Sequence, residues 1–233
     1  MGSSHFYLEF LLTWLSTLVQ SGYRNPAIFA LDYTLVPDAS FPVQIHETIR
    51  GYEHVLAVAG DAGNVCVAGD SAGALLILSL LLHLSGNQAN GVPKPALALL
   101  ISPWVTLVST KHRNTSSDYL EVQHLHQYGL QFAGGRGEDS PLASPGSCTD
   151  MSWWKRSRPF AGIFVTYGED EVLAEDIEDW VQTLRDAGVI VESKRERGGI
   201  HAWPVASLFL SSNRNERLGG LMTITEEIRK RVP

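Results

Sequence analysis

The chain has 233 residues, of which 44% are hydrophobic and 18% charged, and its formal net charge at pH 7 is −7. This length allows one domain with a sizeable core, and the composition is that of a folded protein rather than a disordered one. The acidic balance argues against a nucleic-acid-binding surface. Neither of the two cysteines, Cys66 and Cys148, belongs to a Cys-x-x-Cys motif, so we expect free thiols and no metal or redox site.

The first apolar stretch, residues 6–19, is predicted to be a buried amphipathic helix. It is shorter than the roughly 20 residues that a membrane-spanning helix needs, and Glu9 interrupts it. No basic segment precedes it, as one would in a signal peptide. We therefore expect no membrane span, and a cytoplasmic location if Met1 is the true start.

Strand and helix patterns alternate along the rest of the chain. Apolar runs predict strands at residues 27–31, 64–68, 96–101, 161–167 and 189–192, the first of them buried on both faces. Helical spacing predicts helices at residues 41–59, 74–84, 118–132, 177–187, 202–210 and 216–231. This alternation predicts a single α/β domain over residues 1–233, built on a mostly parallel, doubly wound sheet with helices on both faces. Residues 105–158 lose clear strand character and are expected to form an insert-like segment near the site, where strands end.

The sequence Gly-Asp-Ser-Ala-Gly at residues 69–73 stands between a predicted strand and a predicted helix. This context is what a nucleophile elbow requires, because a strained turn must project the serine hydroxyl from the end of a sheet. Glycines are expected on both flanks, since a Cβ there would collide with the neighbouring strand and helix. Ser71 is therefore the candidate nucleophile.

A serine hydroxyl needs a general base and a carboxylate that orients the base. The chain order in this kind of site is Ser, then Asp or Glu, then His, and His201 lies in a loop beyond the last predicted strand. The acid should follow the preceding strand, where Asp170 and Glu171 are both candidates that spacing alone does not separate. His124 and His126 are two residues apart on a predicted helix, so they face different ways and are not expected to bind a metal.

Several segments together carry a family resemblance. Residues 32–38 with 41–42 resemble Asp-Tyr-x-Leu-x-Pro-Glu followed by Phe-Pro, and residues 69–73, 139–145, 168–173 and 199–203 also match family motifs. With these segments the chain resembles the hormone-sensitive-lipase-like carboxylesterases of the α/β-hydrolase superfamily, especially the fungal members, over nearly its whole length. The resemblance implies Ser71 as nucleophile, His201 as base and Glu171 as acid, with Asp170 as the alternative acid.

The family also supplies part of its oxyanion hole from a His-Gly-Gly-Gly loop, which would precede the segment that residues 2–7 resemble. The chain contains no such sequence, so the backbone N–H of Ala72 is the one oxyanion donor that the resemblance places here. It further implies a truncated α/β-hydrolase fold that lacks the N-terminal strands and the cap, with a gap between the strands at residues 27–31 and 64–68. An uncovered sheet edge of that kind favours association, so an oligomer is compatible with the sequence.

Two functions follow as hypotheses. The first is a serine hydrolase that cleaves carboxylic esters of small apolar substrates through an acyl-enzyme at Ser71, without a metal or cofactor. The alternative is an inactive or weakly active truncated relative, or a small-molecule binder, because the oxyanion loop is absent. The retained His201 favours the enzyme. Amide cleavage ranks below both, because the related formamidases tend to carry His where this chain has Asp70.

Overall fold

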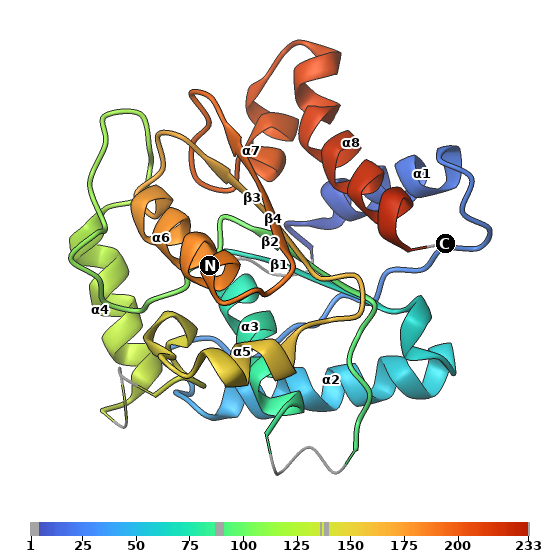
Figure 1. Cartoon of the computed structure of the whole chain (residues 1–233). Coiled ribbons are helices and arrows are strands. Elements are labelled where there is room, and N and C mark those ends of the chain that lie inside the picture. Colours follow the sequence, from blue (N-terminus) through green and yellow to red (C-terminus); the bar gives the residue numbers. More distant parts are fainter. Residues whose placement is uncertain (1–4, 87–90, 136, 138–139, 233) are drawn as a thin grey trace.

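The computed structural model describes residues 5–86, 91–135, 137 and 140–232 (Figure 1). Residue 139 of the family-like segment 139–145 and residues 2–4 of the segment 2–7 lie outside this description. The described strands form one parallel sheet in the order β1 (Cys66–Asp70), β2 (Leu97–Ile101), β3 (Ile163–Gly168) and β4 (Val191–Glu196). The parallel arrangement places the carboxyl ends of these strands at one edge, where the candidate residues lie.

Helices cover both faces of this sheet, because alternate strand residues point into two separate cores. In β2, Ala98 and Leu100 face one core, while Leu97 and Leu99 face the other. The first core is covered by α2 (Val43–Ala59), α3 (Ala72–Leu84), α5 (Met151–Ser157) and α6 (Ala174–Asp186). The second is covered by α1 (Leu8–Gln20), α7 (Trp203–Leu210) and α8 (Arg214–Arg231) (Figure 1). The predicted parallel sheet between two helical layers is confirmed.

The predicted strand at residues 27–31 is wrong. No helix or strand is described between α1 and α2, and Phe29 is 51% exposed rather than buried. A strand needs a hydrogen-bonded partner, and β1 pairs with β2 alone among the described strands. The apolar run at residues 27–31 therefore does not join the sheet, and β1 is an edge strand of the described sheet.

The segment 105–158 holds one predicted helix and one unpredicted one. The expected helix at residues 118–132 is present as α4 (Val122–Ala133). The additional helix, α5, has only seven residues, too few for a periodic pattern to emerge. Its start carries a recognisable signal, because the Asp150 carboxylate accepts hydrogen bonds from the backbone N–H groups of Ser152 and Trp153.

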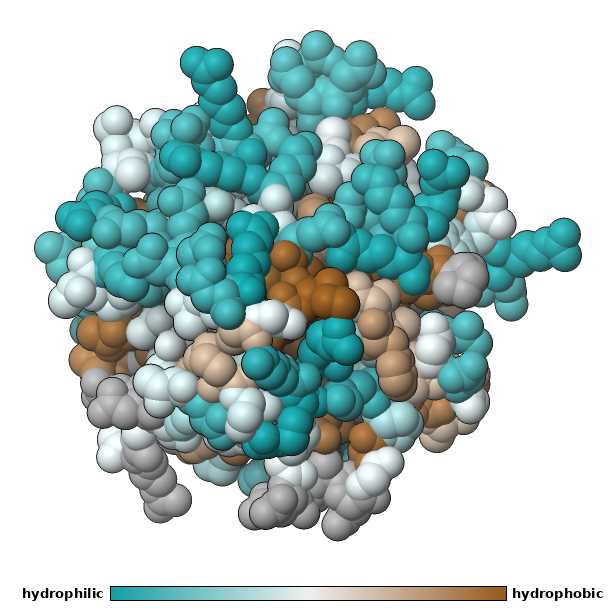
Figure 2. Space-filling model, viewed as in Figure 1, coloured by the Kyte–Doolittle hydropathy of each residue, from teal (hydrophilic) through white to brown (hydrophobic). Residues whose placement is uncertain are grey.

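The hydropathy of the surface agrees with the burial of most apolar residues in the two cores. The face seen in Figure 1 is mostly hydrophilic, with a smaller hydrophobic area near its centre (Figure 2). In the part of the chain that the structure describes, no helix combines the length and apolar character needed to cross a bilayer.

Gly69, the first residue of the predicted elbow, packs directly against the start of α3. A Cβ at Gly69 would lie 2.5 Å from the carbonyl carbon of Gly73 and 2.7 Å from the backbone nitrogen of Ala74. Backbone atoms cannot move aside cheaply, so Gly69→Ala is expected to lower the free energy of unfolding by about 3 kcal/mol. Urea denaturation followed by circular dichroism measures this loss.

Gly73 provides the matched control, and here the sequence expectation is wrong. A Cβ at Gly73 meets no described atom within 4 Å, so this glycine is not required by packing in the structure. Gly73→Ala is therefore expected to leave stability nearly unchanged. Equal losses from both substitutions would contradict the packing argument for Gly69.

Candidate active site

Ser71 occupies the turn between β1 and α3 in a backbone conformation that non-glycine residues rarely adopt, with φ 51° and ψ −117°. The turn is fixed from the neighbouring strand end. The N–H of Ser71 donates to the carbonyl of Ile101 at 2.9 Å, and the carbonyl of Ser71 accepts from the N–H of Trp104 at 3.2 Å. The strand, strained turn and helix that a nucleophile elbow needs are all present around Ser71.

Glu171 and His201 are brought together although they lie on different loops. Nδ1 of His201 is 3.7 Å from Oε1 of Glu171, and the two side chains are 4% and 0% exposed. Neither atom has a hydrogen-bond partner among the described residues. The separation exceeds a direct hydrogen bond by less than about 1 Å, so a small movement would complete the acid–base contact.

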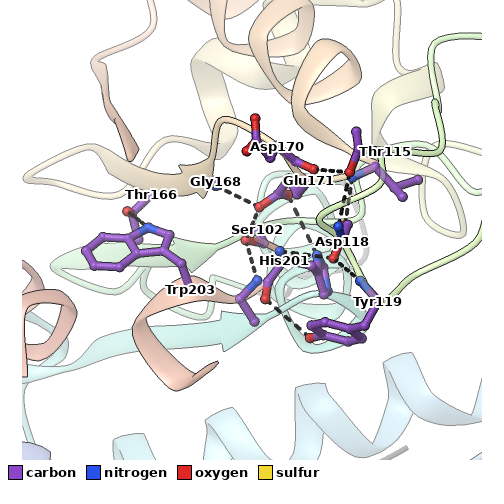
Figure 3. A network of polar contacts seen from close by, with 12 residues as sticks. Ser102, Thr115, Asp118, Tyr119, Thr166, Gly168, Asp170, Glu171, His201 and Trp203 are labelled. Carbon is purple, nitrogen blue, oxygen red and sulfur yellow. Dashed lines mark hydrogen bonds and ion pairs between the residues drawn. The ribbon is translucent and has the colours of Figure 1, made fainter. Parts of the chain in front are cut away.

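The other oxygen of Glu171 is fully engaged (Figure 3). Oε2 accepts from the hydroxyl of Ser102 at 2.6 Å and from the backbone N–H of Gly168 at 2.7 Å. The Ser102 hydroxyl also accepts from the N–H of Ala202 at 2.9 Å, which ties the acid to the histidine loop. Because Oε2 is held by these two donors, Oε1 is the oxygen left to face His201. Ser102 was not predicted as a site residue, although it follows the end of a strand.

Asp170, the alternative acid, is placed differently. Its backbone N–H donates to the carbonyl of Gly199 at 2.9 Å, and its carbonyl accepts from the hydroxyl of Thr115 at 2.6 Å. Figure 3 shows its carboxylate pointing away from His201. Among the described residues, no ion pair joins that carboxylate to His201, so the geometry favours Glu171 as the partner of the imidazole.

The carboxylates around the buried His201 side chain shift its pKa. Burial by itself lowers the pKa of His201, but the neighbouring Glu171 carboxylate, together with Asp118 and Asp70, outweighs burial and raises that pKa above its ordinary value. Burial in turn raises the pKa of the Asp70 carboxyl, against the opposing hydrogen bond from Tyr7. Asp70 directly precedes Ser71 in the elbow, and its charge is one of those that raise the pKa of His201.

The Tyr7 hydroxyl donates to Oδ2 of Asp70 at 2.6 Å and ties α1 to the elbow. Tyr7→Phe would leave this partly buried carboxylate oxygen without its donor, so we expect a loss of about 1–3 kcal/mol in the free energy of unfolding. Urea denaturation measures the loss. Tyr128→Phe is the control, because the described structure gives the half-exposed Tyr128 hydroxyl no hydrogen bond. If Tyr7→Phe were as stable as that control, the bond to Asp70 would contribute nothing measurable.

A serine hydrolase also needs a contact between the serine and the base, and backbone donors for the oxyanion. In the described part of the chain, the Ser71 hydroxyl makes no hydrogen bond, so its contact with His201 is not formed; such contacts are often loose without substrate. The N–H of Ala72, at the first position of α3, is one that a helix leaves without an internal acceptor, and it is available to an oxyanion. Ser71, Ala72, Glu171 and His201 all lie at the carboxyl ends of strands or directly beyond them.

A second cluster of polar side chains was not predicted. Nδ1 of His112 lies 3.1 Å from Nε2 of His126, and Nε2 of His112 lies 3.5 Å from Oδ2 of Asp176, which also accepts from Ser109 through its other oxygen. A nearby cavity of about 90 Å³ is lined by Asp176 but not by Ser71 or His201. In the described ranges, no three His, Cys, Asp or Glu side chains are arranged to hold a metal ion. The cluster therefore joins α4 to α6 rather than forming part of the candidate active site.

Comparison with known proteins assigns the chain to a family. A family model described as alpha/beta hydrolase fold matches residues 17–205. The chain is similar to an acetyl-hydrolase of Streptomyces hygroscopicus, with 30% identity over 76% of this chain and 57% of that protein. It is also similar to steryl acetyl hydrolase 1 of Saccharomyces cerevisiae, with 22% identity over 89% of this chain and 53% of that protein.

Among solved structures, the chain resembles a hormone-sensitive lipase from a metagenome library, with 25% identity, a TM-score of 0.76, and coverage of 95% of this chain and 72% of that one. It spans about half the length of the curated relatives it matches. The family match extends over most of the sequence and agrees with the observed sheet and helical layers. The chain is thus a hormone-sensitive-lipase-like member of the α/β-hydrolase fold family.

Proposed function

We propose that the chain is a serine carboxylesterase that acts on esters of small acyl groups. The observation that carries the proposal is the buried pair of Glu171 and His201, placed at the sheet edge where Ser71 occupies a strained elbow. Burying an acid and a base side chain that face each other costs free energy of folding, because both lose their hydration. Pairs of this kind cluster at functional sites. The names of two relatives, an acetyl-hydrolase and a steryl acetyl hydrolase, support an acetyl ester as the substrate class.

In the proposed reaction, Nε2 of His201 takes the proton of the Ser71 hydroxyl while the serine oxygen attacks the ester carbonyl. The N–H of Ala72 stabilises the negative charge on the carbonyl oxygen. The carbon–oxygen bond to the alcohol then breaks, the alcohol leaves with the proton from His201, and an acyl group remains on Ser71. Water, activated in the same way, releases the acid and restores the serine. Glu171 orients the imidazole and stabilises its charged form.

Hydrolysis of p-nitrophenyl acetate by the purified chain tests the proposal. We expect saturable release of p-nitrophenol, and a lower rate with the octanoate ester if the site takes small acyl groups. A folded chain that releases p-nitrophenol no faster than buffer would contradict the enzyme. That result would favour the weakly active or ligand-binding alternative, in which a single oxyanion donor is insufficient.

A further inference from the structure

The segment 115–119, between β2 and α4, fastens the loop that carries Glu171 on both sides of this residue (Figure 3). The hydroxyl of Thr115 donates to the carbonyl of Asp170 at 2.6 Å. Oδ2 of Asp118 accepts from the backbone N–H of Val172 at 2.8 Å. The residues directly before and after Glu171 are therefore each held by a side chain of the same short segment.

The same segment also holds His201 by its backbone. The N–H of His201 donates to Oδ1 of Asp118 at 3.3 Å, and the Tyr119 hydroxyl donates to the carbonyl of His201 at 3.3 Å. The rings of Tyr119 and His201 meet edge to face, with their centres 5.9 Å apart. Asp118 therefore contacts both loops of the acid–base pair through its two carboxylate oxygens.

A carboxylate is suited to this position because it accepts hydrogen bonds at both oxygens and donates none. Asp118 accepts three backbone N–H groups, those of Tyr119 at 2.8 Å, Val172 and His201. An asparagine has one acceptor oxygen, and its amide nitrogen would face an N–H donor. The hydroxyl of Thr115 also accepts from the N–H of Asp118 at 3.1 Å, which fixes the turn that presents the carboxylate.

We propose that Asp118 is a positioning residue for the acid–base pair, and that its carboxylate sets the approach of Glu171 to His201 by binding the backbone of both loops. The inference deepens the proposed function and rests on it. The sequence places Asp118 in the insert-like segment 105–158, as the first residue of a predicted helix, and does not identify it as a site residue; in the structure it precedes α4. Its contacts are with the backbone of the two loops, so its role is to place catalytic groups.

Asp118→Asn tests the proposal through kcat and the pH dependence of ester hydrolysis. Four groups face the imidazole: Glu171 from the loop after β3, Asp118 and Tyr119 from the segment after β2, and Asp70 from β1. Removing the Asp118 charge lowers the pKa of His201, so the acid limb of the rate profile should move to lower pH. Misplacement of the pair should reduce kcat by about tenfold or more while KM stays within about twofold.

Asp150→Asn is the matched control. Asp150 also accepts backbone N–H groups, from Ser152 and Trp153, and the substitution makes the same change of charge, but it lies at the start of α5. Thr115→Val is a second test that keeps the Asp118 charge; we expect a lower kcat with an unmoved acid limb. An Asp118→Asn variant whose kcat and acid limb match those of Asp150→Asn would overturn the proposal. A loss of kcat in Asp118→Asn that is fully explained by a lower melting temperature would also overturn it.

Titration of His201 by NMR separates this inference from the proposed function, because it requires no turnover. If the wild type hydrolyses no ester, the proposed function fails. A lower imidazole pKa in Asp118→Asn than in Asp150→Asn would then still show that Asp118 acts on His201. An unchanged imidazole pKa would overturn the inference whether or not the wild type is an esterase.

Discussion

Replacing Ser71 by alanine is expected to reduce the hydrolysis of p-nitrophenyl acetate by at least about a thousandfold. The reason is chemical, because alanine has no oxygen to attack the ester carbonyl and no acyl-enzyme can form. Serine and alanine are similar in size, and the turn is held by backbone hydrogen bonds to Ile101 and Trp104, so the fold should be kept. Steady-state rates with matched melting temperatures measure the effect.

Ser157→Ala is the control for this substitution. Ser157 is fully buried, and its hydroxyl donates to the carbonyl of Trp154 at 2.9 Å at the end of α5, away from the elbow. The variant should keep the wild-type rate per folded molecule. If Ser71→Ala also kept that rate, any esterase activity of the chain would arise from another group, and Ser71 would not be the nucleophile.

Glu171→Gln is expected to lower kcat by about 10³- to 10⁴-fold. Ser102 and Gly168 both donate to Oε2, so the single oxygen of glutamine should take that place. The amide N–H₂ then faces Nδ1 of His201 and can only donate to it. An imidazole that accepts at Nδ1 carries its proton on Nε2, which is the wrong tautomer for removing a proton from serine.

The pH dependence adds a second readout for Glu171. The carboxylate raises the pKa of His201, so the wild-type acid limb should lie above the ordinary histidine value of about 6.5. Without that charge the limb should move to lower pH. Asp170→Asn is the matched control, and we expect a nearly wild-type rate because its carboxylate points away from His201. The opposite ranking of the two variants would make Asp170 the acid.

The sequence was sufficient to predict a mostly parallel sheet covered by helices, because the alternation of strand and helix patterns is local. Short apolar runs, which predict strands, alternate with segments that have helical spacing. The serine motif lies between one such run and one such segment, so its position at a strand-to-helix junction can be predicted from neighbouring residues alone. Pairing is not local, which is why residues 27–31 were mistaken for a strand. Their apolar character is real, but no described strand lies beside them to complete a hydrogen-bonded ladder.

The acid illustrates a different limit. Asp170 and Glu171 are adjacent, and nothing in their spacing shows which of them turns toward the imidazole. The choice is made by donors from other parts of the chain, namely Ser102 after β2 and the N–H of Gly168 at the end of β3. Asp118 was missed for the same reason, since its three N–H donors come from segments that meet only in the folded protein.

The most direct test of Ser71 as an activated nucleophile is covalent labelling with a fluorophosphonate followed by peptide mass mapping. Such probes react with serines that a neighbouring base has made nucleophilic, and they need no knowledge of the natural substrate. We predict one label per chain, on the peptide that contains Ser71, and its loss in His201→Ala. A folded wild-type chain that stays unlabelled, or one labelled equally with and without His201, would contradict the proposed serine–histidine chemistry.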